Sequence, residues 1–167
     1  SVQDANIPHL EKRGAATQLM VDGEPFLVLG GEVHNSSSSS LEYMQAIWPK
    51  LASANLNTVL APVSWELIEP EEGKFDFALV DGLINDARQH DLRLVFLWFG
   101  SWKNMVSSYA PVWVRANPQR FACAMDGSGN RLPILSTFSE AACQADAKAF
   151  AALMQHIKAV DSRDHTV

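Results

Sequence analysis

Clusters of aromatic and polar side chains follow three apolar segments, and they are the parts of this sequence that could do chemistry. The clusters are Glu32, His34 and Asn35; Ser64, Trp65 and Glu66; and Trp98, Ser101, Trp102 and Asn104. An indole ring packs against the C–H groups of a sugar ring, and carboxylates and amides bond to sugar hydroxyls. A single tryptophan is more often a core residue, and His34 could equally be satisfied by a backbone group. Taken together, however, the clusters indicate a carbohydrate-binding site.

The second cluster opens an acidic stretch, WELIEPEEGKFDF, at residues 65–77. Glu69, Glu71 and Glu72 surround a proline and a glycine, which is the composition of a turn, so we expect these three carboxylates to be solvated. Glu66 comes directly after the strand, where its side chain can point toward a ligand. The stretch therefore predicts one site carboxylate and three turn carboxylates.

Three largely apolar segments, at residues 26–31, 57–63 and 92–98, predict buried strands, and the first is continuously apolar, as expected of a strand covered on both faces. Amphipathic segments between and after them predict helices, and this alternation is typical of an α/β fold. The strands begin roughly thirty residues apart, as βαβ units require. We therefore expect parallel, adjacent strands whose carboxyl ends, and the three clusters, meet at one edge of a sheet.

Two hairpins are expected outside these helices. Asp-Gly at 22–23 lies between the strand-like segments 18–21 and 25–31, which is a strong hairpin signal. The segment MDGSGNRL, at 125–132, has the composition of a second hairpin turn.

Three helices are expected, and the first should be kinked or restarted by Pro49. Their expected N-cap residues are Ser40, Asp76 and Ser139. The second helix has an apolar stripe of Val80, Leu83, Ile84 and Ala87, and the third has one of Phe150, Leu153, Met154, Ile157 and Val160. The final residues, DHTV, are expected to begin a fourth strand.

A (β/α)8 barrel (TIM barrel) fits this distribution of clusters, because the loops at the carboxyl ends of its strands build the active site. A doubly wound sheet fits less well, since it concentrates its site at one switch point and no glycine-rich phosphate-binding turn follows a strand here. A full barrel has roughly 250 residues. We therefore expect residues 17–167 to be the N-terminal three to four βα units of a barrel, preceded by a short β-hairpin and truncated before strand four. Residues 1–16 are expected to be an N-terminal extension.

Composition limits the partners of the chain. Of its 167 residues 47% are hydrophobic, and the net charge is −6 without a basic run, so neither nucleic acid nor a membrane surface is an expected partner. The longest apolar run, at 94–100, is too short to cross a bilayer. Cys123 and Cys143 make neither a disulfide framework nor a metal site, and no metal or other cofactor is expected. The compartment stays open, with a periplasmic or secreted location slightly favoured over a cytoplasmic one.

The segments DGEPFLVLGGEVHN and NTVLAPVSWELIEPEEGKFDF resemble the opening of the retaining β-galactosidases of glycoside hydrolase families 35 and 42. In that pattern a hairpin leads into strand one, which ends in Gly-Glu-x-His. Strand two ends in a Trp that is followed by Glu-Pro-x-x-Gly. The segment APVWV, at 110–114, resembles the one after strand three. The resemblance covers most of residues 17–115 and implies a (β/α)8 glycosidase with two catalytic glutamates.

The resemblance also implies substrate contacts at the strand ends, namely Glu32, His34, Asn35, Trp65, Glu66, Trp102 and Asn104. Family 35 members typically carry Asn and His where this chain has Glu66 and Ile68, so the chain resembles a divergent branch. In this clan the acid/base glutamate follows an Asn at the end of strand four, and the nucleophile ends strand seven. The chain contains no Asn-Glu pair, so both catalytic glutamates are expected beyond Val167.

The implied function is hydrolysis of terminal β-galactosides, or related β-glycosides, with retention of anomeric configuration. The expected partner is therefore a carbohydrate substrate; the complete enzyme could form a homo-oligomer, and this chain alone is expected to be inactive. Two alternatives stay open. A non-catalytic carbohydrate-binding module would use the same side chains without acid/base residues, and a small doubly wound α/β domain would have some other function.

Overall fold

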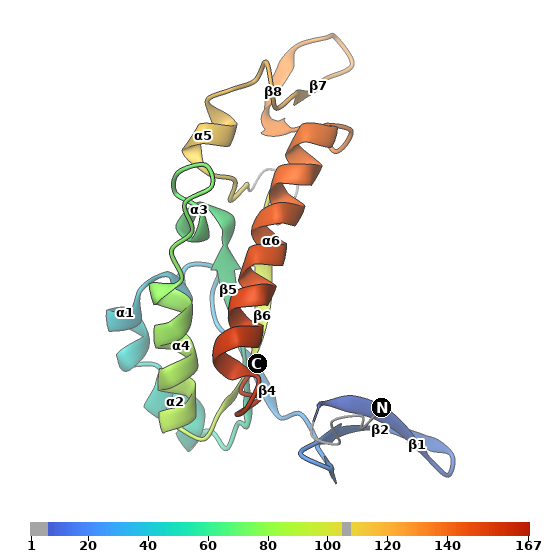
Figure 1. Ribbon diagram of the computed structural model, residues 1–167, viewed down its shortest axis with the longest axis vertical. Helices are drawn as coiled ribbons and strands as arrows, with labels where there is room; N and C mark the ends of the chain where they lie inside the picture. Colours follow the sequence, from blue (N-terminus) through green and yellow to red (C-terminus); the bar gives the residue numbers. More distant parts are fainter. Residues whose placement is uncertain (1–6, 105–107) are drawn as a thin grey trace.

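The fold is known from a computed structural model that describes residues 7–104 and 108–167 (Figure 1). Its central feature is a parallel sheet in the order β4-β5-β6. The strands are β4 (Gly30–Glu32), β5 (Thr58–Ser64) and β6 (Arg93–Phe99). Val59 pairs with Gly31 on one side and with Leu94 on the other, so the three strands end at the same edge. The predicted parallel and adjacent strands are confirmed.

Residues 26–29 differ from the prediction, because they lie outside β4 and the side chains of Leu27 and Leu29 are exposed. The side chain of Asn57 explains this difference. Its amide nitrogen donates to the Leu27 carbonyl and its oxygen accepts from the Leu29 N–H, both at 2.8 Å. Asn57 thus takes the place of a strand partner, and β4 is shorter than its apolar sequence suggests.

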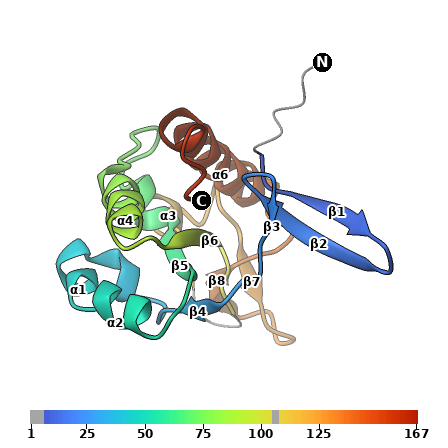
Figure 2. The same cartoon turned by 90° about the horizontal axis from the view of Figure 1, so that it is seen from below.

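Helices cover one face of the parallel sheet (Figure 2). The longer elements on this face are α1 (Leu41–Gln45), α2 (Trp48–Ser53), α4 (Ala78–Gln89) and α6 (Glu140–Asp161). Two one-turn helices, α3 (Trp65–Ile68) and α5 (Val112–Arg115), lie beyond the carboxyl ends of the strands, and a 3-10 turn, η1, spans Ser37–Ser39. The break between α1 and α2 occurs just before Pro49, so the predicted restart is confirmed.

The main core lies between the sheet and these helices. Alternate residues of β5, such as Val59, Ala61 and Val63, are buried in it, as the period of two in a strand requires. Val95 belongs to the opposite face of the sheet and is 44% exposed. The described residues therefore leave part of this opposite face uncovered, around Val95 and the exposed Glu32, whereas Thr58 and Phe99 on the same face are buried.

The predicted caps are found at two of three helices. The Ser40 hydroxyl accepts from the Tyr43 N–H, and the Ser139 hydroxyl accepts from the Ala142 N–H. The helix α4 begins one residue later than expected, with Phe77 at its N-cap. Asp76 nevertheless accepts from the Ala78 N–H at 2.9 Å, so its carboxylate still satisfies a donor of the first turn.

The predicted stripe of α4 is fully buried, whereas that of α6 is only partly buried. Leu153 and Ile157 are buried, together with Ala142 and Ala149. The remaining three predicted residues are exposed: Phe150, Met154 and Val160. They lie beside the buried row rather than on it, because small alanines allow α6 to approach the sheet along a neighbouring row of the helix.

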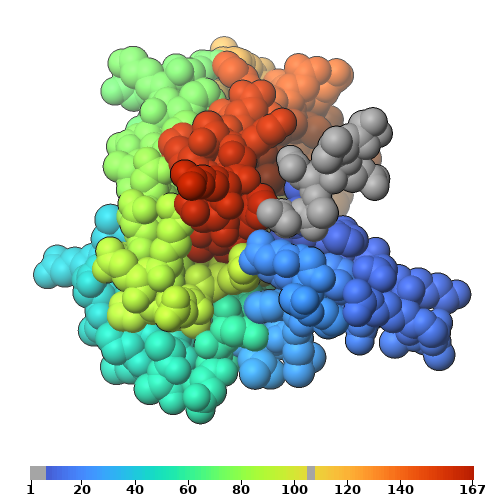
Figure 3. Space-filling view, turned by 60° about the horizontal axis from the view of Figure 1, so that its bottom comes forward, coloured from blue at the N-terminus to red at the C-terminus, as the bar shows by residue number. Residues whose placement is uncertain are grey.

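Two antiparallel units accompany the parallel sheet. At the N-terminal side, β1 (His9–Arg13), β2 (Ala16–Val21) and β3 (Glu24–Pro25) form a sheet that projects from the body (Figure 3). The predicted turn at Asp22-Gly23 is confirmed, and part of the expected N-terminal extension is the strand β1; residues 1–6 lie outside the described residues. The second predicted hairpin joins β7 (Cys123–Met125) and β8 (Arg131–Leu135).

The final residues lie beside β6 without forming a strand of their own. The Leu94 N–H donates to the Thr166 carbonyl at 2.6 Å, which is the kind of backbone hydrogen bond that a neighbouring strand makes. Asp161, at the end of α6, accepts from Arg88 and from the Val167 N–H. The expected fourth strand is therefore not formed, but its first residues are held against the sheet.

Candidate functional site

Glu32, the first predicted site residue, ends β4 on the uncovered face of the sheet. It pairs in register with Leu60, whereas Trp98 pairs with Val63. Leu60 and Val63 are three residues apart, so they point to opposite faces. Glu32 and Trp98 therefore meet at the same edge but lie on opposite faces.

His34 and Asn35 follow β4 on the loop that leads into the 3-10 turn. Both are exposed, and the His34 carbonyl accepts from the Ser37 N–H at 3.0 Å. Their side chains are accessible at the carboxyl end of the sheet, as a contact with a ligand hydroxyl requires.

Glu66 lies on α3, directly after β5, with its side chain 38% exposed. Its backbone N–H donates to the Tyr109 carbonyl at 2.9 Å, and the Tyr109 N–H donates to the Gly100 carbonyl at 3.1 Å. These two bonds join the segment after β5 to the segment after β6. One Glu66 oxygen lies 3.5 Å from the Arg115 guanidinium, so the carboxylate is accessible and next to a positive charge.

Trp65 lies in the core and not on a surface that could stack against a sugar. It is fully buried, and its ring meets Trp113 edge-on with the centroids 5.8 Å apart. Its indole N–H donates to Glu69 Oε2 at 2.8 Å. The local sequence explains the contact, because residues four apart meet across one turn of a helix.

Glu69 was expected to be solvated, and this prediction was wrong, since Glu69 is 1% exposed. Its carboxylate also accepts from the Gly73 N–H at 2.7 Å, and its backbone carbonyl accepts from the Trp113 indole N–H at 3.0 Å. Buried indole N–H groups need acceptors, and Glu69 supplies two. It therefore fixes the turn after α3.

The other two carboxylates of the turn are exposed, as predicted. Glu71 pairs with Lys74, and Glu72 forms a two-pronged ion pair with Arg120 at 2.8 and 2.9 Å. The hydrogen bond from Arg120 holds the pKa of Glu72 below its ordinary value. These pairs stabilise the turn at the surface and leave Glu66 as the accessible carboxylate next to the strand end.

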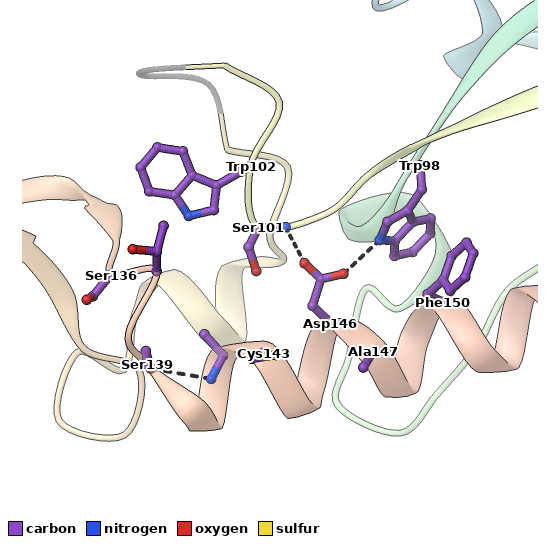
Figure 4. Close-up of a pocket in the computed structure, with 11 residues that line it drawn as sticks. Trp98, Ser101, Trp102, Ser136, Ser139, Cys143, Asp146, Ala147 and Phe150 are labelled. Carbon is purple, nitrogen blue, oxygen red and sulfur yellow. Dashed lines mark hydrogen bonds between the residues drawn. The ribbon is translucent and has the colours of Figure 1, made fainter.

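A cavity of about 390 Å³ lies between the segment after β6 and the first half of α6 (Figure 4). Its lining includes three aromatic rings and several polar groups, among them Trp98, Ser101, Trp102, Cys143, Asp146 and Phe150. The Ser101 hydroxyl is buried and forms no hydrogen bond within the described residues. Rings beside polar groups are the surroundings that a sugar ring can use.

Asp146 is the central polar group of this cavity. One oxygen accepts from the Trp98 indole N–H and the other from the Ser101 backbone N–H, each at 2.7 Å. The sequence does not predict this residue, because a single aspartate on a helix surface carries no signal of a partner 45 residues earlier in the chain. The packing of α6 beside β6 brings Asp146 to these two donors.

The predicted site residues lie along one edge of the sheet and not in a single cavity. Within the described part of the chain, Trp102 is the predicted residue that lines the cavity beside α6, and Asn104 follows it at the surface. His34 lines a separate, more polar hollow with four serines of the loop 36–40. Residues 105–107 lie outside the described residues.

Within residues 7–104 and 108–167, no group of three or more His, Cys, Asp or Glu side chains is placed to hold a metal ion. Cys123 and Cys143 are both free thiols. None of the helices described has the length and apolar character needed to cross a membrane.

Comparison with known proteins relates the chain to enzymes that act on glycosidic bonds. Residues 18–118 match the glycosyl hydrolases family 35. Beta-galactosidase-1-like protein 3 of Homo sapiens is 41% identical over 58 residues, which are 35% of this chain and 9% of that protein. The beta-galactosidase of Xanthomonas manihotis is 36% identical over 62 residues, 37% of this chain and 10% of that protein. The matched segment thus spans about a tenth of the length of these relatives.

The fold is also similar to that of solved glycoside hydrolases of the TIM-barrel type. The exo-beta-1,4-mannosidase Op5Man5 from Opitutaceae bacterium strain TAV5 superposes with a TM-score of 0.58 and 16% identity, covering 96% of this chain and 25% of that chain. At this level of identity the likeness is one of fold alone.

Proposed function

Because this chain belongs to the glycosyl hydrolases of family 35, we propose that it is the N-terminal part of a β-galactosidase-like enzyme that cleaves terminal β-galactosides with retention. The observation that carries the proposal is the parallel sheet. Its three strands lie within the segment that matches the family, and they end at the same edge. Retaining glycosidases use two carboxyl groups about 5–5.5 Å apart, one as acid/base and one as nucleophile. We place both of these groups beyond Val167.

The three parallel strands are proposed to be part of a (β/α)8 barrel. The uncovered face, on which Glu32 and Val95 lie, would then be the barrel interior, and the helices on the other face would be part of the outer ring. The contact between Leu94 and Thr166 supports a fourth strand beside β6. An autonomous carbohydrate-binding module is less well supported, because it would leave an apolar face and a strand edge in water.

The chain is proposed to contribute substrate contacts and no catalytic glutamate. Glu32, His34 and Asn35 are proposed to bind hydroxyls at the end of β4, and Glu66 to do so at the end of β5. Trp102 and Asn104 are proposed to contact the sugar from the segment after β6. Trp65 has a supporting role in this proposal, since its ring is buried against Trp113. The different residues around Glu66 suggest a divergent branch of the family.

Activity of the complete protein tests the proposal. Purified complete protein should hydrolyse nitrophenyl β-galactoside, and proton NMR during the reaction should show the β-anomer of galactose as the first product. Hydrolysis of other β-glycosides but not of the galactoside would change the substrate assignment. An α-anomer as first product would contradict retention.

The 167-residue chain provides a second test. It should not hydrolyse the same substrate above background, because both catalytic glutamates are proposed to lie outside it. Turnover by a carefully purified preparation of the chain would mean that Glu32 or Glu66 is itself catalytic.

A further inference from the structure

We propose that Asp146 is a positioning residue, which holds the segment after β6, and through it Trp102, in place for the sugar substrate. This inference rests on the proposed glycosidase function. It concerns a residue on α6 that lies outside the segment matching the family, at residues 18–118.

The carboxylate of Asp146 binds two parts of the neighbouring chain at once. Its Oδ1 accepts from the indole N–H of Trp98, within β6, and its Oδ2 accepts from the backbone N–H of Ser101, just after β6 (Figure 4). Both bonds are 2.7 Å long, and bonds to a charged acceptor are about twice as strong as neutral ones. The helix therefore fixes the point at which the strand becomes a loop.

Gly100 makes this close approach possible. A Cβ atom at position 100 would lie 2.4 Å from both oxygens of Asp146. The Gly100 carbonyl accepts from the Tyr109 N–H, and the Tyr109 carbonyl accepts from the Glu66 N–H. Asp146 is thus linked through Gly100 and Tyr109 to Glu66 on α3.

Trp102 follows Ser101 by one residue and lines the same cavity. A ring that stacks on a sugar makes the most close contacts when its plane lies parallel to the sugar face. Without Asp146 the base of the segment would lose two hydrogen bonds, and Trp102 would no longer be held in place. Because stacking acts on the bound substrate as well as on the transition state, its loss should raise KM more than it lowers kcat.

The primary test is Asp146→Asn in the complete protein, assayed with nitrophenyl β-galactoside. An amide has one acceptor oxygen, so one of the two donors would face an NH₂ group. We expect KM to rise about tenfold with kcat within about twofold. The matched control is Glu140→Gln on the same helix, whose exposed carboxylate accepts from Gln144 and should leave both constants unchanged.

A double-mutant cycle separates positioning from a merely structural role. In a Trp102→Ala background, Asp146→Asn should raise KM less than about twofold further, because the residue through which it acts has been removed. An unchanged KM in the single variant would overturn the proposal. The same tenfold rise in the Trp102→Ala background would overturn it equally.

A second variant and a fluorescence measurement test the same role of Asp146. If Asp146→Asn does not fold, Gly100→Ala displaces the carboxylate from the loop side and should produce the same rise in KM. An unchanged KM in that variant would contradict the proposal.

If the wild-type complete protein does not hydrolyse the galactoside, the proposed function fails, and acrylamide quenching of tryptophan fluorescence tests positioning instead. These measurements are made in a Trp98→Phe background, because Asp146 also binds the Trp98 indole. Asp146→Asn should then increase quenching in protein that contains Trp102 and not in protein in which Trp102 is also replaced by Phe. Equal quenching with and without Asp146 would overturn the positioning role.

Discussion

At the scale of single residues, the carboxylate of Glu69 joins parts of the chain that the sequence pattern alone does not connect. It accepts from the Trp65 indole and from the Gly73 N–H while being almost fully buried. A buried acceptor of this kind is expensive to replace, because a donor that loses its partner keeps its full desolvation cost.

Glu69→Gln should therefore lower the free energy of unfolding by about 1–3 kcal/mol, since the amide can accept from only one of the two donors in the same geometry. Urea unfolding of the complete protein checks this value. Glu71→Gln is the control, because Glu71 is exposed and should change stability by no more than about 0.5 kcal/mol. Equal effects of the two variants would contradict the buried position of Glu69.

Glu66 is predicted to affect catalysis and not stability. Its carboxylate is accessible at the end of β5, and charge-assisted bonds to sugar hydroxyls contribute roughly 1.5–3 kcal/mol. Glu66→Gln in the complete protein should lower kcat/KM by about ten- to a hundredfold while the thermal midpoint barely moves. Glu71→Gln should change neither quantity. Similar small effects of both variants on kcat/KM would place Glu66 in the turn and not in the site.

At the scale of elements, most of the arrangement could be predicted because strands and caps depend on local patterns. Largely apolar segments predicted the three parallel strands, and Ser40 and Ser139 predicted two helix starts. The exceptions depend on contacts between distant residues. Asn57 satisfies the backbone of residues 27 and 29, so an apolar run there is not a strand. Trp65 was expected to contact a ligand but is buried, because spacing along the chain does not show whether a ring will be buried. Asp146 was not predicted, because spacing does not show which groups a helix carboxylate will bind.

The start of α6 gives a prediction about one element. The Ser139 hydroxyl satisfies the Ala142 N–H, and loss of such a cap costs about 1 kcal/mol. Ser139→Ala should lower the free energy of unfolding by that amount, as measured by urea unfolding. Ser139→Thr retains a capping hydroxyl and should restore most of it. A Thr variant as unstable as the Ala variant would show that the cap is not the cause.

The end of α6 gives a prediction about pH. Burial alone would raise the pKa of Asp161, but hydrogen bonds from the Val167 N–H, Arg88 and Thr166 outweigh burial and lower that pKa below its ordinary value. A depressed folded-state pKa means that the unfolded chain takes up the proton first as the pH falls. The stabilisation is therefore complete above about pH 4 and is lost as the pH falls through the lower, folded-state pKa.

Asp161→Asn should remove this pH dependence. The difference in the free energy of unfolding between wild type and variant should be largest near neutral pH and should shrink as the pH is lowered below about 4. Urea unfolding at a series of pH values measures it. Glu42→Gln, at an exposed position of α1, should show no comparable trend. A difference that stays constant over the acidic range would contradict the argument.

At the scale of the whole molecule, the two faces of the parallel sheet are not equivalent. The face that carries Val63 is covered by helices, whereas Val95 on the other face is 44% exposed. If the sheet closes into a barrel in the complete protein, as proposed, the second face becomes a dry interior filled by side chains. The burial of Val95 would then differ between the 167-residue chain and the complete protein.

Threonine substitutions can measure this difference, because threonine has nearly the shape of valine but places a hydroxyl in the same position. Val95→Thr should change the stability of the 167-residue chain by less than about 0.5 kcal/mol. In the complete protein it should cost about 1–3 kcal/mol, since the hydroxyl would be buried without a partner. Val63→Thr is the control and should destabilise both forms, because Val63 is 1% exposed already. Val95→Thr with the same small cost in both forms would mean that the uncovered face stays open to water, and the proposed closed barrel would be wrong.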